Sequence, residues 1–269
     1  MFLASSLFAQ VPDAIGVQLY SFREQFKTDV PGTLQKVKGM GLRTVETAGF
    51  YGMDAPAFKK MLDTYGMKAV STGADFAELS DPAKLTEVIK KAKILGAEFV
   101  VCFWIPHNGD DFTFEDTKKA VEVFNAAGKT LKKSGLKLLY HPHGYEFRPY
   151  GNGLLFDYLL GQTNPRYVNF EMDIYWVKNP GQDPTAWLLK HPKRWKTLHV
   201  KDQLKGTPGN PNGRTDVEWN VVVGTGNQDM PAVMKAAKKA KVKYYFIEDE
   251  SSRSLQQVPQ TIQYLSRFF

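Results

Sequence analysis

Histidines and carboxylates follow four apolar runs in the second half of the chain. His141-Pro142-His143 ends one run, Asp173 ends the next, His199 and Asp202 close the third, and Glu248-Asp249-Glu250 follows the fourth. Imidazole nitrogens with carboxylate oxygens suit Mn²⁺, Zn²⁺ or Co²⁺ better than Mg²⁺ or Ca²⁺, which prefer oxygen ligands alone. The sequence therefore predicts one divalent metal ion, with Mn, Zn or Co favoured and Mg also allowed, held by His141, Asp173, His199 and Glu248.

Taken singly, each of these residues has a simpler structural role. His199 alone suits a hydrogen-bonded core histidine, Asp173 alone could be the N-cap of a following helix, and Glu248 alone could be an ion-pair partner. Convergence of all four at matching strand ends is what favours a metal site over these separate roles.

Eight short apolar runs rich in Val, Ile, Phe and Tyr must position these groups, and amphipathic segments separate the runs. Alternating β and α segments predict a parallel sheet with right-handed crossovers. Eight units within 269 residues predict a single-domain (β/α)₈ TIM barrel of the α/β class, which needs about 250 residues. The expected strands are 15–20, 43–48, 67–73, 98–104, 136–141, 167–173, 197–202 and 244–249.

Helix boundaries are marked by caps and prolines. Helix starts are expected at Asp81-Pro82, Thr113, Asp183-Pro184 and Asp229-Met230-Pro231. Glycines one to three residues before a strand are typical of helix ends, and they occur at Gly41, Gly66, Gly96 and Gly135. A Gly-, Asn- and Pro-rich segment, 203–228, interrupts the pattern after the seventh strand, which predicts a lid or binding loop.

Charge and composition narrow the partners. The net charge is +7, but the lysine pairs fall in predicted helices that face water, so we expect no nucleic-acid partner.

Residues 1–10 resemble the tail of a secretory signal peptide, with the barrel over 11–269, which favours a periplasmic or secreted location over a cytoplasmic one. No run reaches the roughly 18 apolar residues of a spanning helix, so no membrane partner is expected. Cys102 is the one cysteine, which excludes an intramolecular disulfide.

Five segments together resemble the xylose-isomerase-like barrel family of sugar and sugar-phosphate isomerases and epimerases. They are GLRTVETAGFYG (41–52), YHPHGYEF (140–147), NFEMDIYWV (169–177), LHVKD (198–202) and VGTGNQDMPAVM (223–234). The resemblance implies one metal held by Glu, Asp, His and Glu from strands five to eight. Asp173, His199 and Glu248 match that set, whereas His141 replaces the first glutamate, with His143 and Glu146 as nearby alternates.

The resemblance implies isomerisation or epimerisation of a keto- or aldo-sugar through an enediolate, with Glu248 as the base and Glu46 and His143 as alternates. Glu46 is equally well explained as a structural ion-pair partner. The His-Pro-His motif resembles the inosose-dehydratase-like branch instead, which leaves a lyase or dehydratase acting on keto-sugars or 3-keto-glycosides as the alternative. A DNA-repair endonuclease or a non-catalytic sugar-binding barrel fits the ligand set less well.

The expected partner is a small carbohydrate, and a homo-oligomer is allowed. Polar and aromatic side chains near the strand ends are the candidates for substrate contact, although the aromatic ones are equally well explained as barrel packing. These substrate-binding candidates are Gln18, Tyr20, Arg23, Trp104, Trp176, Lys201 and Asp202.

Overall fold

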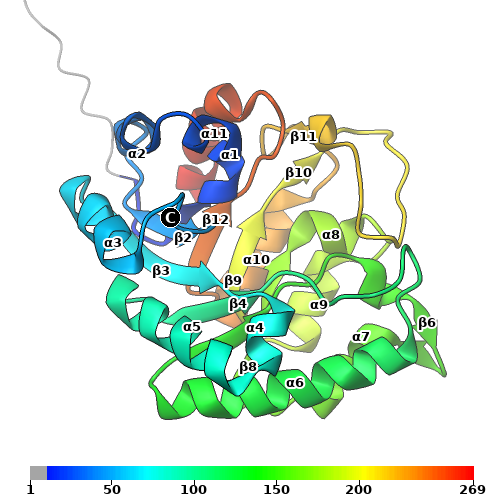
Figure 1. Ribbon diagram of the computed structural model, residues 1–269. Helices are drawn as coiled ribbons and strands as arrows, with labels where there is room; N and C mark the ends of the chain where they lie inside the picture. The colour runs from blue at the N-terminus through cyan, green and yellow to red at the C-terminus, as the bar shows by residue number, and fades with distance from the viewer. Residues whose placement is uncertain (1–10) are drawn as a thin grey trace, which may run out of the picture.

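The structure, a computed structural model, describes residues 11–269, so the predicted signal-peptide remnant at 1–10 lies outside the described residues. Eight parallel strands close into a barrel in which β1 pairs with both β2 and β12, and helices surround it (Figure 1). The predicted TIM barrel is confirmed. Its strands are β1 (Ile15–Gln18), β2 (Thr44–Thr47), β3 (Lys68–Gly73), β4 (Phe99–Cys102), β5 (Lys137–Tyr140), β8 (Val168–Asp173), β9 (Trp195–Val200) and β12 (Tyr244–Ile247).

The helices begin at the predicted signals, because the side chains of Asp81, Thr113, Asp183 and Asp229 each accept a hydrogen bond from the first turn. The four predicted glycines all have positive φ, as helix ends require. The longer helices are α2 (Val30–Gly39), α3 (Ala55–Thr64), α5 (Pro82–Leu95), α6 (Phe114–Lys133), α7 (Leu155–Gln162), α10 (Met230–Ala240) and α11 (Ser254–Leu265). The shorter ones are η1 (Leu19–Phe22), α1 (Arg23–Phe26), α4 (Phe76–Ser80), η2 (Tyr145–Phe147), α8 (Ile174–Lys178), α9 (Pro184–Lys190), η3 (Val217–Trp219) and η4 (Ser266–Phe268).

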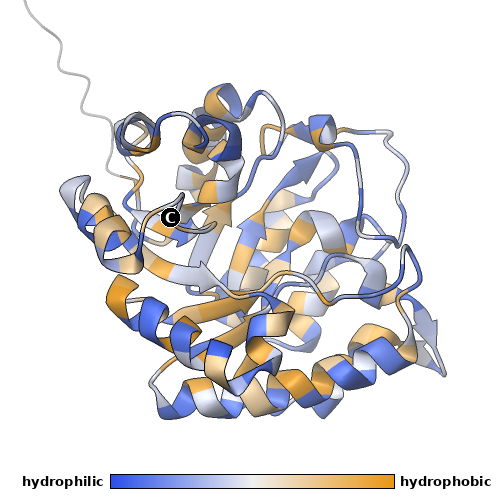
Figure 2. Ribbon diagram, in the orientation of Figure 1, coloured by the Kyte–Doolittle hydropathy of each residue, from blue (hydrophilic) through white to orange (hydrophobic). Residues whose placement is uncertain are grey.

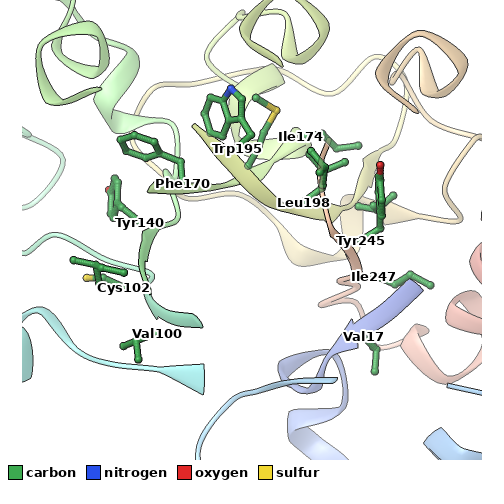
Figure 3. Close-up of a cluster of buried hydrophobic side chains, with 14 of the residues drawn as sticks. Val17, Val100, Cys102, Tyr140, Phe170, Ile174, Trp195, Leu198, Tyr245 and Ile247 are labelled. Atoms are coloured by element: carbon green, nitrogen blue, oxygen red, sulfur yellow. The ribbon is translucent and has the colours of Figure 1, made fainter. Parts of the chain in front are cut away.

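Side chains alternate between the two faces of each strand. One set points outward and packs against the helices, and Figure 3 shows members of this apolar cluster on the strands: Val17, Val100, Tyr140, Leu198 and Ile247. Figure 2 shows hydrophobic (orange) and hydrophilic (blue) residues alternating along the surrounding helices. A second, smaller apolar cluster of buried residues joins several strands: Val70, Phe99, Val101, Leu139, Tyr244 and Phe246. Toward the carboxyl ends of β8, β9 and β12 the side chains become polar: Asp173 ends β8, His199 lies one residue before the end of β9, and Glu248 directly follows β12.

Two antiparallel strand pairs lie outside the barrel sheet, and neither was predicted from the sequence. They pair β6 (Pro149–Tyr150) with β7 (Gly153–Leu154), and β10 (Asp202–Gln203) with β11 (Asn220–Val221). The second begins at Asp202 and brackets most of the irregular segment 203–228. That segment is joined to the end of α8, where Asn179 Nδ2 donates to the carbonyl oxygen of Asn210 (3.0 Å). Within residues 11–269, no helix combines the length and apolar character needed to cross a bilayer.

Candidate metal centre and adjoining cavity

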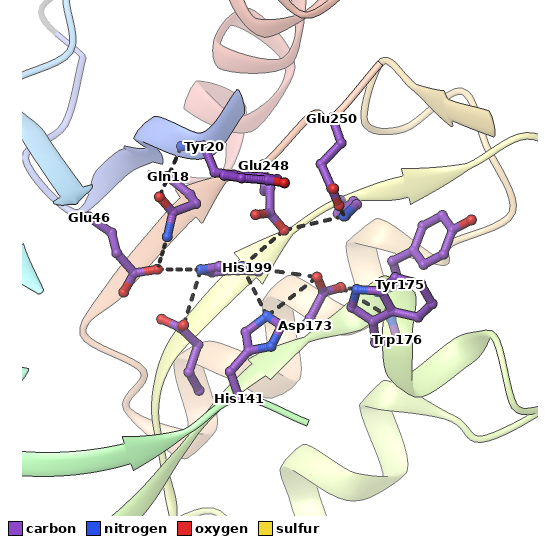
Figure 4. Close-up of polar contacts among 12 residues, drawn as sticks. Gln18, Tyr20, Glu46, His141, Asp173, Tyr175, Trp176, His199, Glu248 and Glu250 are labelled. Atoms are coloured by element: carbon purple, nitrogen blue, oxygen red, sulfur yellow. Dashed lines mark hydrogen bonds and ion pairs between the residues drawn. The ribbon is translucent and has the colours of Figure 1, made fainter. Parts of the chain in front are cut away.

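Four side chains converge at the carboxyl ends of β5, β8, β9 and β12. His141 Nε2 lies 3.1 Å from His199 Nδ1 and 3.6 Å from Asp173 Oδ2, and His199 Nδ1 lies 3.2 Å from Glu248 Oε2 (Figure 4). One nitrogen or oxygen from each of the four residues lies within 4.8 Å of the others. Strand register contributes directly, because β8 and β9 pair Asp173 with His199. The structure thus brings together all four residues that the sequence singled out.

Asp173 divides its two oxygens between two roles. Its Oδ1 accepts hydrogen bonds from the backbone N–H groups of Tyr175 (2.7 Å) and Trp176 (3.2 Å), which caps α8. Its Oδ2 is buried and has no hydrogen-bond partner among the described residues. Burial raises the pKa of this carboxyl. A buried oxygen without a partner is costly unless something binds it, so Oδ2 fits a cation ligand.

Two buried carboxylates fix the orientation of His199. Its Nε2 lies 2.6 Å from Glu46 Oε1 and 3.1 Å from Glu171 Oε2. Because carboxylates accept, Nε2 carries a proton and Nδ1 faces the other three ligands. Burial alone would lower the pKa of His199, but the carboxylates of Glu171, Glu248 and Glu46 raise it well above its usual value. This carboxylate–histidine arrangement is the usual support for a metal-binding imidazole.

Glu46 and Glu171 are themselves held by the barrel interior. Glu46 accepts hydrogen bonds from Gln18 Nε2 (2.7 Å) and from Ser71 Oγ, and Glu171 accepts one from Thr197 Oγ1 (2.6 Å). Burial and the neighbouring charge of Glu46 raise the pKa of Glu171 to about 7. Glu46 is fully buried beneath His199, so its placement favours positioning that imidazole over meeting a substrate.

Glu171 is the functional residue that the sequence analysis missed. Strand alternation could have found it, because it lies two residues before Asp173 on β8 and so faces the same side.

His143 stands beside His141 at the edge of the cluster. The two Nδ1 atoms are 3.3 Å apart, and the His143 ring has its centroid 5.5 Å from both the Trp104 and the Trp176 ring centroids. Burial lowers the pKa of His143 to about 3 and that of His141 well below its usual value. Both rings are therefore neutral near pH 7, and His143 is half-buried with access to a cavity.

Glu146, an alternate ligand in the sequence analysis, serves the loop instead. Its carboxylate accepts from the backbone N–H groups of His143 (3.1 Å) and Gly144 (2.9 Å) and from the Tyr140 hydroxyl. Burial raises its pKa to about 7. These bonds hold the backbone that carries His141 and His143, so Glu146 acts on the site through that loop.

Lys201 joins the site from directly beyond β9. Its ammonium lies 3.3 Å from Glu248 Oε2 and also contacts Glu250 Oε1, although the side chain is buried. Burial disfavours this charge, but the carboxylates of Glu248, Glu250 and Asp173 raise its pKa. Conversely, burial would raise the pKa of Glu248, whereas Lys201 and His199 lower it well below its usual value. Glu248 is therefore an ionised carboxylate.

The other predicted substrate contacts divide into two groups. Gln18 and the exposed Tyr20 line the cavity, whereas Arg23 lies behind Tyr20 and donates to the carbonyl oxygen of Glu250 (2.7 Å). Asp202 is turned to its own loop: its carboxylate accepts from the backbone N–H groups of Gln203, Gly224, Gly226 and Gln228. That placement favours a role for Asp202 in organising the segment 203–228.

A cavity of about 540 Å³ adjoins the cluster, and His141, His143 and Glu248 line one end of it. This volume falls within the range of about 300–1,000 Å³ typical of small-molecule sites. The cavity continues across the mouth of the barrel to the loops after β2 and β3, where its charged and aromatic lining residues are Phe50, Asp75, Glu78 and Lys91.

Comparison with known proteins agrees with this architecture. The chain belongs to the xylose isomerase-like TIM barrel family, whose model matches residues 34–268. No curated protein matches the chain in sequence.

Solved structures with the same fold include a sugar phosphate isomerase/epimerase from Parabacteroides distasonis (24% identity, TM-score 0.79, 98% of this chain and 96% of that chain). The IOLI protein, described with a bound zinc atom, is 15% identical with a TM-score of 0.72 over 95% of this chain and 96% of its own. A probable 3-DHS dehydratase, AsbF, from Bacillus anthracis is 13% identical with a TM-score of 0.71 over 94% and 98%.

Proposed function

We propose that this protein is a divalent-metal-dependent isomerase or epimerase that acts on a keto- or aldo-sugar, or a derivative of one, through an enediolate of the substrate. The observation that carries the proposal is the cluster of His141, Asp173, His199 and Glu248, with ligand atoms within 4.8 Å of one another at one end of a sugar-sized cavity. Membership of the xylose isomerase-like family and the neighbour from Parabacteroides distasonis support the reaction class.

The residues present fit a divalent ion. Two imidazole nitrogens and two carboxylate oxygens suit Zn²⁺, Mn²⁺ or Co²⁺, and the buried Asp173 Oδ2 lacks any other partner among residues 11–269. When bound, such an ion supplies Lewis-acid stabilisation of the negative charge that develops on a sugar carbonyl oxygen. The zinc described for the IOLI neighbour makes Zn²⁺ the first ion to test.

Proton transfer then falls to cavity-lining groups of this chain. His143 offers a neutral imidazole, and Glu248 offers an ionised carboxylate. Either could take the proton from the carbon next to the carbonyl group, and return it to the neighbouring carbon or to the opposite face. Lys201 holds Glu248 in its charged form and brings a cation to the same end of the cavity. Glu46 lies beneath His199 and supports that imidazole from below.

A lyase acting by β-elimination is the second candidate, and the nature of the strand-five residue favours it. The family pattern places a glutamate where this chain has His141, facing Glu248 across the substrate, so the second glutamate base is missing at that position. Elimination needs only one base next to the carbonyl group, because that base, once it has taken the proton, can pass it to the leaving group; Glu248 or His143 could fill this role. The name of the AsbF neighbour, a probable dehydratase, is consistent with this chemistry.

Incubating the metal-loaded enzyme with keto-sugars in D₂O separates the two candidates. Deuterium in an isomeric sugar, seen by NMR, would support the isomerase or epimerase, whereas an unsaturated product absorbing in the ultraviolet would support the lyase. His143→Gln should lower turnover while metal content stays unchanged. The matched control is His191→Gln, since His191 packs on Trp187 outside the cavity. Full activity after chelation of all metal would contradict the proposal.

A further inference from the structure

The cavity reaches well beyond the four candidate ligands. The barrel order β1-β12-β9-β8-β5-β4-β3-β2 puts the ligand-bearing strands on one half of the mouth and β2 and β3 on the other half. The lining nevertheless includes Phe50 after β2, Asp75 and Glu78 after β3, and Lys91 from α5. We call these four residues the far subsite. A ligand that fills the cavity must therefore extend from the ligand cluster across to the opposite half of the barrel.

A strained turn presents Phe50 to this far end. Gly49, Tyr51 and Gly52 all have positive φ (109°, 51° and 80°), which is costly for a tyrosine. Tyr51 is held there by stacking on Phe26, with ring centroids 4.1 Å apart, and the Phe50 ring packs edge-on against Phe58 (5.8 Å). These packing contacts offset the cost of the backbone strain, and the turn places the Phe50 ring at the cavity wall.

The charges of the far subsite are unfavourable for an anion. Lys91, whose Nζ lies 5.8 Å from the Phe50 ring centroid, shares the subsite with the carboxylates of Asp75 and Glu78, and no arginine among residues 11–269 lines the cavity. Glu78 Oε2 already accepts from the backbone N–H of Asp75 (2.9 Å) at the start of α4, so a carboxylate occupies the place that a phosphate would need. Lys201 is likewise taken by Glu248 and Glu250.

We propose that the far subsite binds a second, uncharged sugar ring, so that the enzyme takes a non-phosphorylated disaccharide or glycoside and rejects sugar phosphates. An aromatic ring offers a stacking surface for the C–H face of a sugar. Carboxylates accept hydrogen bonds from the hydroxyl groups of a sugar, and the Lys91 ammonium can donate hydrogen bonds to the oxygens of those hydroxyl groups. A phosphate, in contrast, is bound by arginine forks, lysines or free N–H groups at a helix start. This inference rests on the proposed function, because it assigns the reacting ring to the metal end.

Isothermal titration of the zinc-loaded protein with fructose, fructose 6-phosphate and two ketose disaccharides, lactulose and turanose, tests the proposal. We expect at least one disaccharide to bind about tenfold more tightly than fructose, because it adds the stacked ring. Fructose 6-phosphate should bind more weakly than fructose, and Asp75→Asn should narrow that difference. Phe50→Ala should weaken disaccharide binding about tenfold and leave fructose binding unchanged. The control is Phe268→Ala, in η4 and outside the cavity.

Several outcomes would overturn the far subsite. The first is tighter binding of fructose 6-phosphate than of fructose. The second is an equal loss of affinity for fructose and for the disaccharide in the Phe50→Ala variant. The third is that no sugar binds to the zinc-loaded protein. Zinc content, measured on the same samples, keeps this test separate from the proposed function. Disaccharide binding to protein that takes up no metal would uphold the far subsite and overturn the metal-dependent reaction.

Discussion

His199 and Glu46, 153 residues apart in sequence, meet inside the barrel with His199 Nε2 2.6 Å from Glu46 Oε1. Glu171 approaches the same nitrogen from β8, with its Oε2 at 3.1 Å. The imidazole is thereby fixed with Nδ1 toward His141, Asp173 and Glu248. The cluster is thus built in two layers: the four candidate ligands, of which His141 and Glu248 line the cavity, and the carboxylates beneath His199 that set its tautomer.

Glu46→Gln and Glu171→Gln should each weaken Zn²⁺ binding by about 10- to 100-fold, because a neutral amide holds the Nε2 proton less strongly than a carboxylate. Competition with a chromophoric chelator measures the affinity, and circular dichroism checks the fold. Glu98→Gln is the matched control, since Glu98 is a partly buried carboxylate that pairs with Lys243 away from the cluster. Unchanged zinc affinity in both test variants would show that His199 needs no such support.

Asp173→Asn separates the two roles of that side chain. Asparagine caps helices as well as aspartate does, so the Oδ1 bonds to α8 should survive while the oxygen facing the other ligands is replaced by an amide nitrogen. We expect zinc affinity to fall by more than about 100-fold, beyond the effect of a supporting residue, with little change in stability. Asp229→Asn makes the same change at the cap of α10 and should bind zinc normally. Normal zinc content of Asp173→Asn, measured by mass spectrometry, would remove Asp173 from the ligand set.

Lys201→Met should destabilise the metal-free protein by about 3–5 kcal/mol, because it leaves Glu248 and Glu250 without their buried counter-charge. Urea unfolding gives the difference. Added Zn²⁺ should restore part of the loss if Glu248 is a ligand. Lys190→Met is the control: it breaks an exposed pair with Asp157 and should cost about 0–1 kcal/mol. Equal effects of the two substitutions would mean that the Lys201 pairs are effectively hydrated.

Glu146 should make stability depend on pH. Burial raises its pKa from the ordinary value of 4.5 to about 7 in the folded protein, so the folded state binds a proton more tightly than the unfolded state does. The contribution of Glu146 to the free energy of unfolding is therefore most favourable below about pH 4.5. It falls by about 3 kcal/mol as the pH rises through 7. Glu146→Gln, which resembles the protonated form, should lack this dependence.

Urea titrations of both proteins from pH 5 to pH 8 test the sign. The stability of the wild type relative to Glu146→Gln should fall as the pH rises. Glu122→Gln, at an exposed position of α6, controls for the amide itself. A wild-type advantage that grows with pH would reverse the assignment and mean that the charged carboxylate is the favoured form.

The sequence by itself determined the barrel, because short apolar runs rich in Val, Ile, Phe and Tyr, N-cap residues and C-terminal glycines are local signals that need no knowledge of the rest of the chain. It also predicted the cluster of candidate ligands, since parallel strands must end at one face and His141, Asp173, His199 and Glu248 each end a strand or lie next to its end. Strand boundaries shifted at the ends: the predicted 197–202 is Trp195–Val200 in the structure, which places Lys201 and Asp202 after β9.

Only the tertiary structure decided what each remaining polar group does. Glu46 and Glu248 are both glutamates near strand ends, yet one lies beneath His199 and the other lines the cavity, a difference set by depth within the barrel. The carboxylates of Asp202 and Glu146 accept hydrogen bonds from backbone N–H groups of loops, and no sequence pattern predicts these contacts. The far subsite likewise joins loops distant in sequence, because closure of the barrel, a property of all eight strands together, is what brings β2 and β3 opposite β8 and β9.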